Sequence, residues 1–177
     1  MARNYWAIAD THFNHANILK FLTDSGDHVR AFDSLQQMNE IMIQNWNEVV
    51  RPGDYVYHLG DVFFGPKDWF ASNWPRLMGR KRLIVGNHDD IKYLSNGAFF
   101  DKILMWHAFD RLLMTHVPIH QSNIRSMKTG EPMLNVHGHI HAQKSPKGPY
   151  HCVCVEQTNY RPVNVDELLA HARALAS

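Results

Sequence analysis

Short apolar runs alternate with one long amphipathic segment in the first half of the chain. Residues 34–49 carry apolar side chains at helical spacing, and Ser34 followed three positions later by Gln37 is a capping-box pattern, so we expect a helix that begins just after Ser34. Short runs rich in aromatic and aliphatic residues, each ending in a polar cluster, predict buried strands at residues 4–9, 55–59 and 83–85.

Strand patterns dominate the second half. The runs that predict strands there are residues 102–106, 112–115, 135–136 and 151–156. A last helix is expected at residues 165–174, with Asn164 as its cap. Shorter helical segments are expected at residues 16–22 and at residues 66–78, the second broken internally by Pro75. Residues 23–33 have the composition of an open, charged loop. Strands alternating with helices and then following one another predict a layered α/β fold.

Size and charge narrow the function classes. The chain has 177 residues, so we expect a single domain over residues 1–177 with one substantial core. A formal net charge of +1 gives no strong field toward nucleic acid or a membrane, and the basic run at residues 76–82 is interpreted as a solvated face. The sequence has no signal-peptide pattern and no apolar run of membrane-spanning length, which leads us to expect a soluble cytoplasmic protein without membrane contact. No pattern indicates an oligomeric state.

Thirteen histidines are the one unusual feature of the composition, because imidazole is the commonest metal ligand in proteins. Cys152 and Cys154 are interpreted as two small buried apolar side chains, since close strand neighbours are poorly placed for a disulfide and too few for a structural zinc site.

Polar residues that suit metal ions follow five of the predicted strands. The carboxyl ends of strands are where ligands bind in α/β sheets, so these residues can converge although they lie far apart in the sequence. The seven candidate metal ligands are Asp10, His12, Asp61, Asn87, His116, His139 and His141. Each residue alone has an ordinary explanation as a helix cap, a turn former or a surface residue. These explanations do not account for all seven residues occurring in this order at strand ends.

Together these residues resemble the ordered motifs of the calcineurin-like metallophosphoesterases, and in particular their small bacterial and phage members. The motifs are Asp10-x-His12, Gly60-Asp61, Gly86-Asn87-His88-Asp89, His116 and Gly138-His139-x-His141. The resemblance implies a four-layer α/β/β/α sandwich, with the metal site at the carboxyl ends of the strands.

The same resemblance implies a dinuclear centre that hydrolyses a phosphomonoester or phosphodiester by attack of a metal-bridging hydroxide. One metal would be held by Asp10, His12, Asp61 and His141. The other would be held by Asp61, Asn87, His116 and His139, so Asp61 would bridge the two. Mixed oxygen and nitrogen donors favour transition metals, with manganese preferred and an iron/zinc pair or nickel as alternatives.

Other residues are expected to serve catalysis or substrate binding. By resemblance, His88 contacts the phosphate or protonates the leaving oxygen, and Asp89 is a candidate for orienting His88. His15 either reaches the substrate or caps the following turn. Arg125 lies in the segment 117–131, which either binds the rest of the substrate or is a solvated connection.

The substrate class stays open at this level. A phosphorylated small molecule or a nucleotide fits the pattern, and a nuclease is an alternative, although no interleaving of basic and aromatic residues indicates a nucleic-acid groove. A non-catalytic metal-binding scaffold is the alternative from a different class, and the presence of His88 argues against it.

Overall fold

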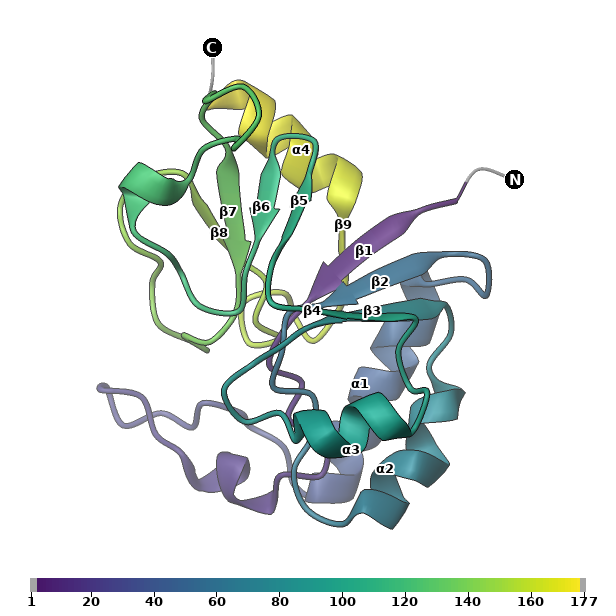
Figure 1. Cartoon of the computed structure of the whole chain (residues 1–177). Coiled ribbons are helices and arrows are strands. Elements are labelled where there is room, and N and C mark those ends of the chain that lie inside the picture. The colour runs from purple at the N-terminus through teal and green to yellow at the C-terminus, as the bar shows by residue number, and fades with distance from the viewer. Residues whose placement is uncertain (1–2, 176–177) are drawn as a thin grey trace.

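The computed structural model describes residues 3–175, which form two β-sheets and four α-helices (Figure 1). The first sheet has the strand order β4-β3-β2-β1-β9; β1 to β4 are parallel, and β9 pairs with β1 in the antiparallel sense. Its strands are β1 (Tyr5–Ile8), β2 (Tyr55–His58), β3 (Arg80–Ile84), β4 (Lys102–Leu104) and β9 (Val163–Asn164).

The second sheet has the order β5-β6-β7-β8, with β5 antiparallel to β6 and the other neighbours parallel. Its strands are β5 (His107–Phe109), β6 (Leu112–Met114), β7 (Leu134–His137) and β8 (Tyr150–Cys152). The α-helices are α1 (Leu35–Val49), α2 (Lys67–Asn73), α3 (Ile91–Asn96) and α4 (Val165–Ala174). Short 3₁₀ helices occur at η1 (Ala16–Lys20), η2 (Trp74–Arg76) and η3 (Gln121–Asn123).

Helix α1 begins where its capping pattern predicts. Ser34 is the N-cap, and its hydroxyl oxygen accepts a hydrogen bond from the Gln37 N–H at 3.1 Å. The apolar stripe of the helix includes Met38 and Trp46, both buried, and joins one core cluster with residues from one face of the first sheet, among them Val56. Helices α1, α2 and α3 lie together on this side of the sheet (Figure 1).

The opposite face of the first sheet packs toward the second sheet. Ala7 and Tyr57 from the first sheet share a core with Met114 and Val136 of the second, and Leu168 of α4 joins them. Helix α4 contacts strands of both sheets. Leu113, on the other face of β6, packs with residues of the chain between β6 and β7. The α/β class is therefore established, whereas the four-layer arrangement is not confirmed.

Several local predictions need correction. The strand expected at residues 151–156 ends at Cys152. The helix expected at residues 66–78 is broken at Pro75, as predicted, into a short α-helix and a 3₁₀ turn, because proline removes a backbone donor, but it ends at Arg76. The loop at residues 23–33 is less open than its charges suggested, since Arg30 is only 1% exposed. Helix α3 and strands β5 and β9 are too short to leave a periodic signal.

Within residues 3–175, no helix combines the length and apolar character that crossing a membrane requires.

Candidate metal centre

Five strands from the two sheets deliver polar side chains to one place. In the first sheet β1 leads into Asp10, β2 into Asp61 and β3 into Asn87. In the second sheet β6 leads into His116 and β7 into His139. The carboxyl ends of these strands thus meet where the two sheets adjoin, as expected for a ligand site in an α/β fold.

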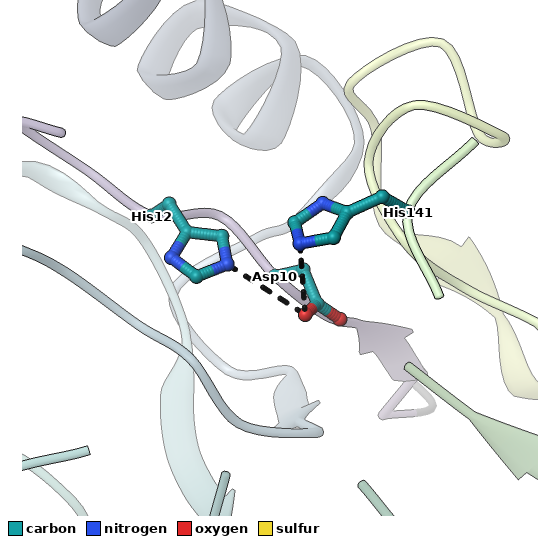
Figure 2. Close-up of side chains that lie close together, drawn as sticks. All are labelled: Asp10, His12 and His141. Atoms are coloured by element: carbon teal, nitrogen blue, oxygen red, sulfur yellow. Dashed lines mark ion pairs between the residues drawn. The ribbon is translucent and has the colours of Figure 1, made fainter. Parts of the chain in front are cut away.

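One group of candidate ligands surrounds the Asp10 carboxylate. Figure 2 shows His12 and His141 extending toward Asp10, whose Oδ1 lies 3.7 Å from His12 Nε2 and 3.9 Å from His141 Nε2. One ligand atom from each of the three residues lies within 4.8 Å of the other two. This spacing leaves room for a cation among them.

A second group adjoins the first. Ligand atoms of Asp10, Asp61 and His116 also lie within 4.8 Å of one another. Asp61 Oδ2 is 3.7 Å from His12 Nε2 and 3.6 Å from His116 Nε2, so this carboxylate faces both groups. Asp10 belongs to both groups as well, a sharing that the sequence did not suggest.

The two remaining candidates lie beside His116. Asn87 Oδ1 is 2.8 Å from His116 Nε2 and 3.0 Å from His139 Nδ1. Asn87 and His139 are exposed, whereas Asp10, His12, Asp61 and His116 are buried. The structure therefore brings all seven predicted ligands into one cluster that has a buried side and an open side.

Hydrogen bonding within the cluster leaves metal-binding atoms unused. Asp10 Oδ2 accepts hydrogen bonds from the His139 N–H at 2.7 Å and from the Cys154 thiol at 3.3 Å. Asp10 Oδ1 and both ring nitrogens of His12 are buried without a hydrogen-bond partner among the described residues. Since buried polar atoms without partners are costly, these atoms fit a site completed by a cation.

The protonation states suit ligation. Burial acts to raise the pKa of Asp10, but the nearby His12, His116 and His141 and the hydrogen bond from the His139 N–H outweigh it and hold the pKa at about 2. Burial lowers the pKa of His12, despite the opposing effect of Asp10. An ionised carboxylate and a neutral imidazole are the forms that bind metals.

Backbone conformations at the centre are unusual. Left-handed φ values occur at Asp10 (56°), His12 (43°), Asp61 (57°), His139 (73°) and His141 (50°). Residues with side chains adopt this region rarely, and such conformations gather at functional sites because the surrounding structure must enforce them. Five of the seven predicted ligands share this feature.

Two glycines permit the close approach of the loops. A Cβ atom at Gly138 would lie 2.4 Å from Asp10 Oδ2, and one at Gly86 would lie 2.2 Å from Asp61 Oδ1. Any larger residue would displace a carboxylate, so the glycines of these two motifs are needed to leave space.

His88 lies on the open side of the cluster. The residue is exposed, and the centroid of its ring lies 6.0 Å from that of the His12 ring and 5.2 Å from that of the Phe64 ring. The backbone N–H of His88 donates a hydrogen bond to Asp61 Oδ1 at 2.9 Å. This places an imidazole at the rim of the centre without making it one of the buried ligands.

Asp89 does not lie where an orienting partner of His88 would. Its carboxylate accepts hydrogen bonds from the N–H groups of Asp61, Val62 and Gly86 at 3.1, 2.9 and 2.8 Å, and no hydrogen bond joins it to the His88 ring within residues 3–175. Burial raises the pKa of Asp89, and the nearby Asp61 carboxylate adds to this effect. Asp89 instead ties the loops after β2 and β3 together.

Two nearby histidines have structural partners. His15 Nδ1 accepts a hydrogen bond from the Ile18 N–H at 3.1 Å, which is the turn-capping role, and its ring lies beside that of Phe64. His58 is fully buried, with Nε2 2.9 Å from the hydroxyl of Thr11.

No protein-family model matches the chain. The "Uncharacterized protein MJ1445" of Methanocaldococcus jannaschii is 34% identical over 173 residues, which cover 93% of this chain and 88% of that protein. The chain belongs to the MJ1445 family.

Two further proteins extend the comparison. The "Gene 66 protein" of Mycobacterium phage D29 is 27% identical over 168 residues, 79% of each chain. A crystal structure of AQ665, a protein of unknown function from Aquifex aeolicus, matches 96% of this chain and 99% of its own length, with a TM-score of 0.70 and 26% identity. The names of these proteins describe no activity, so the function must be argued from the site.

In this member of the MJ1445 family, a buried ion pair that the sequence did not predict lies behind the centre. The Arg30 guanidinium donates to the carbonyl oxygens of Asp10 at 2.5 Å and Thr11 at 2.7 Å, and to Glu156 Oε1 at 2.8 Å. Glu156 Oε1 is also 2.8 Å from His141 Nδ1. The pair thus holds the backbone of the first motif and the ring of the last.

The charges of this pair support one another. Burial acts to raise the pKa of Glu156, but Arg30 and His141 outweigh it and lower the pKa. For His141, burial acts to lower the pKa, and the Glu156 carboxylate reverses the effect and raises it. A hydrogen bond from Nδ1 to the carboxylate leaves His141 Nε2 facing Asp10, the arrangement by which carboxylates orient metal-binding histidines. A lone Arg in a charged loop and a Glu after a strand give no pattern from which this pair could have been predicted.

Proposed function

We propose that the chain is a dinuclear-metal-dependent phosphoesterase of the calcineurin-like superfamily, which hydrolyses a phosphomonoester or phosphodiester. One observation carries the proposal: a carboxylate oxygen of Asp10 and both ring nitrogens of His12 are buried without a hydrogen-bond partner among the described residues. Possible metal-binding atoms of Asp61, His116 and His141 lie close to them. An ordinary core would not bring two carboxylates and several imidazoles together without partners.

The proposed ligand sets follow the motif order. Asp10, His12, Asp61 and His141 would hold one ion, and Asp61, Asn87, His116 and His139 the other. Mixed oxygen and nitrogen donors suit manganese, iron, zinc or nickel better than calcium and do not select one of them. Manganese is our preferred metal, with an iron/zinc pair or nickel as alternatives. When bound, two such ions supply Lewis-acid polarisation of the phosphoryl oxygens.

Residues of the chain itself are proposed to contact the substrate, to transfer a proton and to position the metal ligands. His88, exposed at the rim of the centre, is placed to contact the phosphate or to protonate the leaving oxygen. Asn87, His15 and Arg125 are further candidates for contact with substrate. Glu156 and Arg30 position His141 and the backbone of the first motif.

The proposal includes the fold of the superfamily. Two facing sheets and the helices α1 to α3 on the first sheet are compatible with a four-layer α/β/β/α sandwich. The core shared by both sheets and α4 supports a single domain over residues 1–177.

Hydrolysis of bis- and mono-p-nitrophenyl phosphate by metal-free protein, reloaded with Mn²⁺, Co²⁺, Ni²⁺ or Zn²⁺, tests the proposal. We expect no turnover without metal, turnover with at least one of these ions, and two bound ions per chain by elemental analysis. Asp61→Asn should lose both turnover and metal, whereas the matched variant of an exposed aspartate, Asp68→Asn, should keep both.

Two outcomes would contradict the proposal. If the protein binds no metal ion, the proposed metal centre does not exist. Protein that binds two ions but hydrolyses neither ester with any of them would support the non-catalytic scaffold instead.

A further inference from the structure

A pocket of about 850 Å³ opens directly beside the candidate metal centre. Asn87 and His116 line both the pocket and the centre. The volume is in the range of small-molecule binding sites. A phosphoester whose phosphoryl group lay at the centre would therefore have its organic group in or near this pocket.

The walls of the pocket are mostly apolar, and several of the side chains are unusually exposed. Met105 is 72% exposed, Trp106 48%, Val117 41% and Met127 89%, and all four line the pocket. They come from the chain between β4 and β5 and from the chain between β6 and β7. Large apolar side chains gathered at one place on a surface indicate a binding site.

Polar groups in the pocket are few, and some already have partners. The Thr115 hydroxyl donates to the Val117 carbonyl at 2.6 Å, and Ser126 Oγ accepts from the Lys128 N–H at 3.3 Å. Among the lining side chains described, the Asn123 amide and the Trp106 indole N–H are the uncharged polar groups beyond the metal centre that form no hydrogen bond. A nucleoside, with its many donors and acceptors, would find few partners here.

The charged groups of the pocket favour an anion. Asp110, Arg125 and Lys128 line it. The two cations Arg125 and Lys128 outnumber the single carboxylate of Asp110, which also lies 3.9 Å from Arg173. These cations give a weak positive field that suits a phosphate ester.

A second hollow of about 950 Å³ borders the other side of the centre at His139 and His141. The exposed Phe21 and Leu22 line it, but polar and charged residues outnumber the apolar ones in its lining, which makes it a poorer fit for an apolar group.

We propose that the pocket beside Asn87 and His116 binds the organic group of the substrate, and that this group is apolar, an alkyl chain or an aryl ring. The inference rests on the proposed phosphoesterase function, because the metal centre is taken to hold the phosphoryl group. It selects the substrate class that the centre itself leaves open.

Binding of non-hydrolysable phosphonates to the Mn²⁺-loaded protein, measured by calorimetry, tests the inference. Each buried methylene tightens binding by up to about 4-fold, so hexylphosphonate should bind at least about 30-fold more tightly than methylphosphonate. The ratio of the two affinities is the readout, because it cancels changes at the metal centre.

Variants locate the effect in the pocket. Trp106→Ala and Met127→Ser should each reduce the ratio to below about 5-fold, since they remove apolar area from the walls. Met78→Ser is the matched control, because Met78 is also partly exposed, at 39%, but lies outside the pocket. It should keep the ratio of the unmodified protein.

Several results would overturn the inference. Equal affinities for the two phosphonates would mean that the organic group stays in solvent. Tighter binding of adenosine 5′-phosphonate than of hexylphosphonate would assign the pocket to a nucleoside.

A neutral probe separates failure of the pocket from failure of the proposed function. If no phosphonate binds with any metal, the phosphoesterase proposal fails. Binding of 2-naphthol to metal-free protein then still tests whether the pocket accepts an apolar group. Binding that Met127→Ser weakens and Met78→Ser does not would support an apolar site. No binding of 2-naphthol would overturn it.

Discussion

The exposed ring of His88 and the buried ring of His12 lie side by side, yet their surroundings assign them different roles. Both ring nitrogens of His12 are unpartnered and its Nε2 faces the carboxylates of Asp10 and Asp61, whereas His88 is anchored to the centre through its backbone N–H. The buried His12 is therefore the proposed metal ligand, and the exposed His88 is the proposed general acid.

His88→Ala should therefore keep two bound metal ions and lose turnover by ~10²–10⁴-fold, the range for a lost general acid. Elemental analysis and steady-state kinetics with bis-p-nitrophenyl phosphate check the two parts separately. His28→Ala, which removes an exposed histidine of the loop at residues 23–33, is the control and should retain turnover. Unchanged turnover in His88→Ala would remove His88 from the mechanism.

The fully buried His58 should make stability depend on pH. The Thr11 hydroxyl donates to the Val62 carbonyl at 2.7 Å, so His58 Nε2 must donate to Thr11, and His58 Nδ1 is left buried without a partner. Burial lowers the pKa of His58 to about 3 in the folded protein. The unfolded chain binds this proton below about pH 6.5, so the stability contributed by neutral His58 is lost as the pH falls from about 6.5 toward 3.

Between pH 7.5 and pH 5, this linkage amounts to about 2 kcal/mol. Urea unfolding of the metal-free protein should show that His58→Gln loses less stability on acidification than the wild type, by roughly that amount. His28→Gln should respond to pH as the wild type does. An identical pH response in His58→Gln would show that protonation of His58 does not cause the loss of stability at low pH.

At the scale of elements, the loops after β1 and β7 depend on the buried pair Arg30 and Glu156. The side chains of both are at most 2% exposed, and they connect the loop at residues 23–33 to the segment after β8. Removing one partner of such a pair leaves a buried charge uncompensated, which is strongly destabilising.

Glu156→Gln should weaken metal binding by roughly 10–100-fold, because His141 loses the carboxylate that orients it. Calorimetric titration with Mn²⁺ measures this, and circular dichroism confirms that the variant is folded. Glu48→Gln is the matched control, since Glu48 also forms an ion pair with an arginine, Arg161, but both side chains of that pair are more than 40% exposed. Full metal affinity in Glu156→Gln would show that His141 needs no partner for ligation.

At the scale of the whole molecule, a centre built from both sheets should couple metal binding to global stability. An ion that binds the native state and not the unfolded chain stabilises by about 2.7 kcal/mol at 100 times its Kd. For a chain of this size that corresponds to roughly 5–10 °C in Tm. Scanning calorimetry before and after addition of Mn²⁺ should show this rise.

Asp61→Asn should lose most of the rise, because Asp61 faces both groups of ligands, and Asp68→Asn should keep it. Each shift is measured within one variant, so changes in the stability of the metal-free protein cancel. No rise in the wild type would mean that the cluster does not bind the ion.

The sequence by itself determined the elements with strong local patterns and the residues available for the centre. Helix α1 follows from its capping pair and apolar stripe, and the seven candidate ligands were identifiable because each follows a strand end. These features depend on neighbours along the chain, which is why they can be read without a fold.

Only the tertiary structure decided how those residues meet and what supports them. Asp10 belongs to both ligand groups, Asp89 ties loops instead of orienting His88, and Arg30 is buried within a loop that its charges predicted to be open. The apolar pocket likewise combines the loop after β3 with the connections between β4 and β5 and between β6 and β7. Partners, burial and cavity walls come from segments far apart along the chain, and no local pattern encodes them.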